Sequence, residues 1–161
     1  MIRIKHLLPV VILLTPLLAI CVTDSNADSP IPEINFGEII SGDNTMSGLQ
    51  ENRKIEVFSD QASLNSSLAI YVQFITEHTV DFNSRRAVLL SMGGRSTGGY
   101  SIKAEAVEDY DDYIKLKVFL TKPGNNCITT QALTSPYQFI EIESVKELVI
   151  EERVVVVNCN Q

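Results

Sequence analysis

The chain has few of the residues that build catalytic and metal sites. Its 161 residues include two histidines, three cysteines and no tryptophan. A serine–histidine–aspartate arrangement would have to use His78, with Glu77 or Asp81 to orient it, but this segment reads as the end of a helix. Histidine and cysteine do not cluster with the spacing of a zinc site. We therefore expect a protein that is not an enzyme and that holds neither a metal nor another cofactor; a hydrolase using His78 is the weaker alternative.

Positively charged residues are also fewer than negatively charged ones: 13 lysines and arginines stand against 20 aspartates and glutamates, which gives a formal net charge of −7. Such a chain repels a phosphate backbone on average, and no basic stripe with interleaved aromatic residues offsets this repulsion. We therefore expect no nucleic-acid partner. The acidic run 108–112 lacks the glycine and the distal glutamate of an EF-hand loop, and we interpret it as a solvated hairpin tip.

The one long apolar run lies near the N-terminus, at residues 7–20, after a positively charged start. It is short for a membrane span and has the order of a secretory signal peptide. Ser25 and Ala27 supply the small residues of a cleavage site after Ala27. We therefore expect residues 1–27 to be a signal peptide and the protein to be exported to the periplasm or the extracellular space.

Cys21 supports a second interpretation of the same segment. It follows Leu18-Ala19-Ile20 and resembles the cysteine of a lipoprotein signal, which is lipidated and becomes the new N-terminus. Ile20 is bulkier than the residue that usually precedes such a cysteine. In this alternative the protein is anchored to the envelope by lipid at Cys21, and it has no other contact with the membrane.

Cys127 and Cys159 are the cysteines that remain after the signal. Two thiols exported into an oxidising compartment are most simply interpreted as one disulfide. Closing a loop of this length restricts the unfolded chain by about 3–4 kcal/mol. The bond would hold the C-terminal strand to the sheet.

Hydrophobic periodicity predicts one domain of the α+β class after a spacer. Residues 28–52 are expected to form a spacer and a first strand, and residues 53–161 the domain. Apolar residues at helical spacing predict one amphipathic helix over residues 60–76, packed by its apolar stripe against the core. The other segments predict a mainly antiparallel sheet of about six to eight short strands. The expected strands are Asn35–Ile40, Lys54–Phe58, Ala87–Met92, Tyr100–Val107, Tyr113–Thr121, Ile128–Leu133, Tyr137–Ile142 and Val145–Val157. Val145–Glu152 could instead be a short helix that begins at a capping box.

A glycine-rich loop between two of these strands is the first candidate surface. Its sequence is Gly93-Gly94-Arg95-Ser96-Thr97-Gly98-Gly99-Tyr100. A nucleotide-binding loop opens onto a helix, whereas a strand follows here. The loop is expected to meet a protein partner: glycines permit close backbone approach, Tyr100 supplies buried area and Arg95 a charged contact. The alternative is a strand connection with unusual torsions.

A second candidate surface is the bend Thr134-Ser135-Pro136-Tyr137. Pro136 restricts the preceding residue to extended torsions and removes one ladder donor. The segment is therefore expected to be a strand that bends, either as a contact surface or as an edge strand broken by proline.

Three blocks of the sequence together resemble the PrcB C-terminal domain family. They are Val80-Asp81-Phe82 followed by Ala87-Val88-Leu89-Leu90, then Gly93–Ile102, then Thr129–Tyr137. Members of that family are typically exported proteins or lipoproteins, and the founding example supports the stability of a secreted protease. The resemblance implies a non-catalytic accessory protein with a protein partner, such as a secreted protease, and no catalytic residues.

A second resemblance supports a different function. Thr97-Gly98-Gly99-Tyr100 is similar to the loop that chagasin-type inhibitors insert into cysteine proteases. It implies a protease inhibitor, but the expected helix and the third block fit that family poorly.

Overall fold

The computed structural model describes residues 31–45, 52–73 and 78–159. The expected signal peptide and Cys21 lie outside these residues, as do positions 74–76 of the expected helix. No helix among the residues described is long and apolar enough to cross a membrane.

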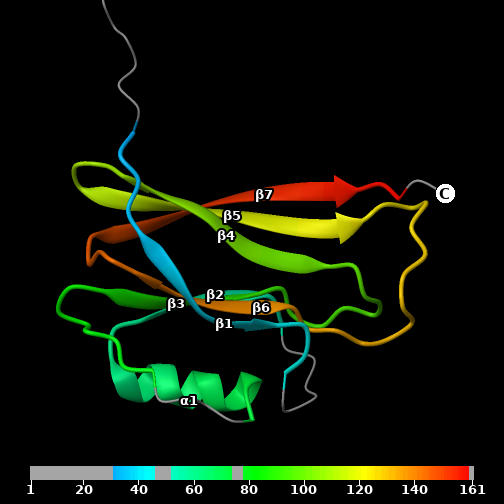
Figure 1. The fold of residues 1–161 in the computed structure, drawn as a ribbon, viewed down its shortest axis with the longest axis horizontal. Coiled ribbons are helices and arrows are strands. Elements are labelled where there is room, and N and C mark those ends of the chain that lie inside the picture. The colour runs from blue at the N-terminus through cyan, green and yellow to red at the C-terminus, as the bar shows by residue number, and fades with distance from the viewer. Residues whose placement is uncertain (1–30, 46–51, 74–77, 160–161) are drawn as a thin grey trace, which may run out of the picture.

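Within the described residues, seven strands form two sheets that face each other, and one helix covers the outer face of one sheet (Figure 1). The strands are β1 (Phe36–Gly42), β2 (Lys54–Phe58), β3 (Arg86–Ser91), β4 (Ser101–Asp109), β5 (Tyr113–Pro123), β6 (Tyr137–Ile142) and β7 (Glu147–Val157). The four-stranded sheet has the order β1-β6-β3-β2, and the three-stranded sheet has the order β4-β5-β7. The α+β class expected from the sequence is confirmed.

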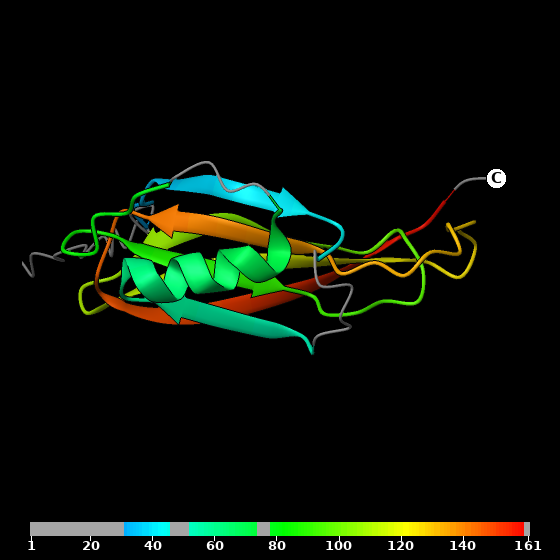
Figure 2. The ribbon, with the colours of Figure 1, turned by 90° about the horizontal axis from the view of Figure 1, so that it is seen from below.

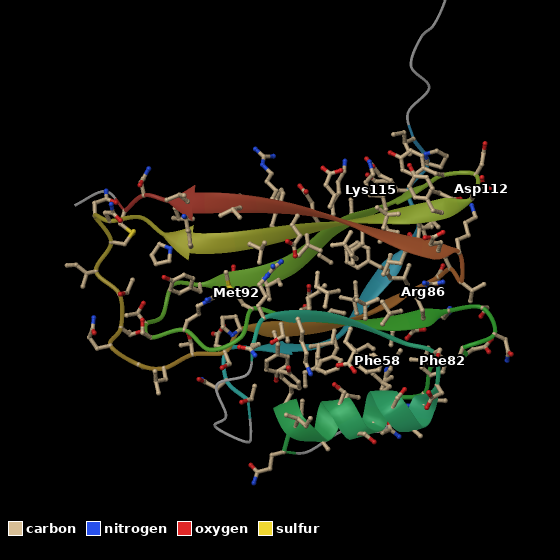
Figure 3. All side chains as sticks on the ribbon, turned by 180° about the vertical axis from the view of Figure 1, so that it is seen from behind. Phe58, Phe82, Arg86, Met92, Asp112 and Lys115 are labelled. Atoms are coloured by element: carbon tan, nitrogen blue, oxygen red, sulfur yellow. A yellow bond between two sulfur atoms is a disulfide. The ribbon has the colours of Figure 1, made fainter. Side chains whose placement is uncertain are left out.

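The main core lies between the two sheets. Along β5, buried residues alternate with half-buried ones, so one face of this strand packs into the core. Ile114, Leu116, Val118 and Leu120 are buried, whereas the residues between them are half-buried on the opposite face. Met92 reaches the same core from the four-stranded sheet and lies between the sheets in Figure 3.

A second core lies between the four-stranded sheet and helix α1 (Gln61–Tyr71). Asp60 begins the helix, because its side chain accepts a hydrogen bond from Ser63 N at 2.8 Å. Leu64, Leu68 and Tyr71 form the buried stripe, as expected. Figure 2 shows the helix lying along this sheet, and Figure 3 shows Phe58 in the layer between them. The helix is shorter than expected, because Val72 is already in an extended conformation.

One expected strand was wrong, and the last expected strand is confirmed but begins two residues later than predicted. Residues 128–133 form no strand but belong to a long connection between β5 and β6. The segment 147–157 is a strand, so the alternative helix is excluded. This strand, β7, pairs with β5 in parallel rather than antiparallel register. A parallel pair needs a crossover, which the chain makes through β6 in the other sheet.

Candidate protein-binding surface

The glycine-rich loop and the connection before β6 lie at the same end of the molecule (Figure 1). We call residues 93–100 and 124–136 together the loop end. The first segment joins β3 to β4, and the second joins β5 to β6. The two candidate surfaces predicted separately from the sequence therefore belong to one region of the structure.

Backbone hydrogen bonds join the two segments directly. Arg95 N donates to Thr134 O at 2.7 Å, and Thr134 N donates to Arg95 O at 3.0 Å. Gly98 N donates to Thr130 O at 3.0 Å, and Thr134 Oγ1 donates to Thr97 O at 3.0 Å. Each segment satisfies polar backbone groups of the other, so the loop end is a paired structure rather than two free loops.

The glycines of the loop are required by this pairing. Gly93 and Gly99 have φ of 71° and 87°, a left-handed region that other residues rarely adopt. A Cβ on Gly98 would collide with Thr130 Oγ1. These glycines therefore allow the two segments of the loop end to approach each other closely, in addition to any contact with a partner.

Arg95 is engaged inside the loop end. Its Nη2 donates to Met92 O at 2.8 Å, and its guanidinium lies 5.5 Å from the centre of the Tyr100 ring. This carbonyl and ring contact hold the loop in shape. Ser96 and Gly99 are the exposed residues of the loop, whereas Gly93 and Gly98 are buried and Gly94, Thr97 and Tyr100 are half-buried.

Tyr100 presents part of its ring to a shallow groove of about 590 Å³. Lys122, Asn125, Asn126 and Asn158 supply polar groups to the same groove. An aromatic ring beside amide and ammonium donors suits the backbone carbonyls of a protein partner. The groove is open and polar, which does not suit a small apolar ligand.

The bend at Pro136 supports the loop end from beneath. Ser135, Pro136 and Tyr137 are buried, and Thr134 is half-buried. Burial, followed by the nearby carboxylate of Asp43, raises the pKa of Tyr137, whose hydroxyl lies 3.4 Å from Tyr71 O. Of the second candidate surface, only Thr134 is in a position to contact a partner.

Two exposed apolar side chains of the loop end were not identified from the sequence. Ile128 is 95 % exposed and Leu133 is 63 % exposed. Residues 128–133 were expected to form a strand, in which these side chains would pack against a core. The structure leaves them in solvent beside the paired loop, as apolar residues at protein interfaces often are before binding.

A disulfide fixes the connection that carries Ile128. Cys127 and Cys159 are bonded, with their Cα atoms 4.9 Å apart, as the sequence predicted. Asn126 Nδ2 donates to Cys159 O at 2.6 Å, and Gly124 N donates to Val157 O at 2.8 Å. The connection is thereby tied to the end of β7, so Ile128 projects from a fixed base.

His78 lies in a separate charged cluster. Its Nε2 is 2.7 Å from Glu141 Oε2, and Arg85 Nη1 donates to Glu141 Oε1 at 2.6 Å. Partial burial opposes ionisation of Glu141, but the hydrogen bonds from Arg85 and His78 outweigh it and lower the pKa of this carboxyl. Asp81 bonds Asn83 and Ser84 instead of orienting His78.

The surroundings of this cluster are polar and charged. The cluster borders a cavity of about 220 Å³, and no hydroxyl or thiol is among the described residues that line it. The described ranges also contain no group of histidine, cysteine and acidic residues that could hold a metal ion. The arrangement joins His78 and Arg85 to β6 through ion pairs with Glu141.

Comparison with known proteins supports the resemblance seen in the sequence. Residues 87–143 match the family model described as PrcB C-terminal. The matched segment is less than half of the chain and runs from β3 through the loop end to the residue after β6. No curated protein and no solved structure matches the chain. Residues 87–143, which include the whole loop end, therefore carry the sequence pattern of the PrcB C-terminal family.

Proposed function

We propose that this protein is a non-catalytic accessory module that binds an exported protease through the loop end. The family match supports an accessory role in a protease complex. The pairing of the two segments supports the location, since it makes one preformed surface from regions 37 residues apart. A preformed surface binds more tightly than mobile loops because less conformational entropy is lost on binding.

The observation that carries the proposal is the exposure of Ile128 and Leu133 in the loop end. These side chains would supply the apolar centre of the interface, and Ser96, Asn125 and Asn126 its polar rim.

Substitution of the exposed apolar residues tests this proposal. The double variant Ile128→Ser, Leu133→Ser removes apolar area without creating a cavity, so the thermal unfolding midpoint should change little. Val145→Ser is the matched control, because Val145 is 55 % exposed and follows β6 at the opposite end. We expect the double variant to lose copurification with the exported protease and to shorten the lifetime of that protease in cells. Equal recovery of the protease with the double variant and the control would contradict the proposal.

An activity assay of the copurified complex separates an accessory module from a protease inhibitor. An accessory module leaves the bound protease active on a peptide substrate, whereas a loop inserted into the active site blocks hydrolysis. We expect activity to be retained in the copurified complex.

We also propose that the protein is exported by the N-terminal segment. The support is the sequence of residues 1–27 and the disulfide, which is stable in an oxidising compartment. Intact-mass measurement of the exported protein should find an N-terminus at Asp28. A mass that corresponds to a lipidated Cys21 would show anchorage instead, and an unprocessed Met1 would contradict export by this route.

A further inference from the structure

We propose that β7 is a self-association surface through which two copies of this chain join edge to edge as antiparallel strands. β7 ends the three-stranded sheet, and within the described residues no strand pairs with its free edge. It is 11 residues long, and an open edge of this length presents unpaired backbone donors and acceptors to another strand. The proposal rests on no part of the proposed function.

The opposite edge of the same sheet is partly closed. Ile34 N donates to Val107 O at 2.8 Å, and Asp109 N donates to Pro32 O at 2.8 Å. The segment before β1 therefore covers part of β4. The edge of β7 has no such cover among the described residues, which leaves β7 as the available edge.

Side chains of β7 alternate between the core and the outer face. Leu148 and Ile150 pack against the core, so the even-numbered positions face the other sheet. Glu151 lies 3.4 Å from Lys115 Nζ, and Arg153 lies over the Phe119 ring, so the odd-numbered positions face outward. Lys115 can be followed on this outer face in Figure 3.

Both faces of this open edge carry exposed apolar side chains. They are Val149, Val154, Val156 and Val157, with exposed fractions of 39, 59, 48 and 47 %. A strand added at this edge would cover apolar area on each face as well as pair the backbone.

The sequence of β7 is complementary to itself about Glu152. Symmetric antiparallel pairing centred there places Glu151 of each copy opposite Arg153 of the other. Three further pairs are apolar: Val149 with Val155, Ile150 with Val154, and Leu148 with Val156; at the two ends of the strand Glu147 lies opposite Val157. Each Glu152 faces its own symmetry copy, but its carboxylate already forms an ion pair with Arg53 of its own chain.

Other symmetric registers lack this complementarity. Centring the pair on Glu151 or on Arg153 also places one charged residue opposite its own copy, and it removes both Glu151–Arg153 pairs. The same shifts place Glu152 opposite Ile150 or Val154. Because opposed unlike charges stabilise a strand pair, the two Glu151–Arg153 pairs favour the register centred on Glu152 over these two.

Antiparallel pairing also leaves both loop ends accessible. β7 runs toward the loop end, where Cys159 is bonded to Cys127. Two antiparallel copies of β7 therefore place their loop ends at opposite ends of the dimer. Such a dimer presents two separate loop ends.

Charge exchange across the edge tests the proposal. Sedimentation equilibrium of the full-length protein should show a dimer for the wild type. Arg153→Glu and Glu151→Arg should each weaken it roughly tenfold, since each change makes both cross-strand charge pairs repulsive. Lys103→Glu on the outer face of β4 is the control and should leave the dimer unchanged. An equimolar mixture of the two single variants should restore association, because each chain then meets the opposite charge.

Native mass spectrometry with one variant isotopically labelled identifies the restored species. We expect it to contain one chain of each variant in excess of a random mixture. A wild-type monomer would mean that Glu151, Glu152 and Arg153 protect the edge and would overturn the proposal. A dimer that both single variants leave intact, or a mixture that associates no better than either variant alone, would also overturn it.

Discussion

The left-handed conformation of Gly99 yields a prediction with a matched control in the same chain. Gly99 has φ of 87°, and an added Cβ would lie 3.3 Å from Pro123 Cβ and 3.4 Å from Thr129 Cγ2. Gly37 in β1 has nothing within 4 Å of an added Cβ and no positive φ. The substitution to alanine is chemically identical at both positions, so the difference between them reports the local backbone.

The expected free-energy changes have opposite signs. A non-glycine residue in the left-handed region costs about 1–2 kcal/mol, and crowding against Pro123 adds to this cost. Alanine also restricts the unfolded chain, which contributes about 0.4–1 kcal/mol of stability wherever the native conformation accepts it. We therefore expect Gly99→Ala to lower the free energy of unfolding by about 1 kcal/mol and Gly37→Ala to raise it by about 0.5 kcal/mol.

Urea unfolding, followed by far-ultraviolet circular dichroism, measures both changes. A second measurement, copurification of the exported protease, should fall for Gly99→Ala and stay unchanged for Gly37→Ala. If Gly99→Ala were as stable as Gly37→Ala and bound the protease equally well, the loop conformation would have no role in either stability or binding.

Three further changes test other parts of the structure. Phe139→Ala should lower the free energy of unfolding by about 3–5 kcal/mol in a urea titration, because its ring is fully buried against Phe58 and Tyr71. Glu141→Gln should cost about 1–2 kcal/mol at neutral pH, since it weakens two charged hydrogen bonds to partly exposed partners. Because the pKa of Glu141 is lowered by folding, its stabilisation is present above the unfolded pKa and is lost as pH falls through the folded pKa, so urea titrations should converge for wild type and variant in acid. Replacing both cysteines of the disulfide by serine should cost about 3–4 kcal/mol, and a reducing agent should then have no further effect on the unfolding midpoint.

Local patterning predicted the strands that lie on a core. β2 and β6 begin and end where the alternation does, and β5 differs from expectation only at its C-terminal end. The disulfide also followed from composition, because the two cysteines that follow the expected signal peptide allow one pairing. The helix was predicted in type but not in length, since the residues after Tyr71 continue an apolar pattern while Val72 is extended.

The hydrophobic patterns did not predict which segments that are distant in the sequence pair with each other. Residues 128–133 have a β-rich composition, but the segment pairs with the glycine loop instead of a sheet, and Ile128 remains in solvent. The parallel pairing of β7 with β5 depends on a crossover between sheets, which hydrophobic periodicity does not encode. Arg95 looked like a partner contact from composition, whereas its position over Tyr100 is visible only in three dimensions.

Site-specific photocrosslinking in living cells tests the central claim most directly. A photoreactive amino acid is placed at Leu133 in one strain and at Val145 in another, and the crosslinked products are identified by mass spectrometry. We predict a crosslink to the exported protease from position 133 and none from position 145. Crosslinking of the protease from position 145 but not from position 133 would contradict the assignment of the loop end as the binding surface.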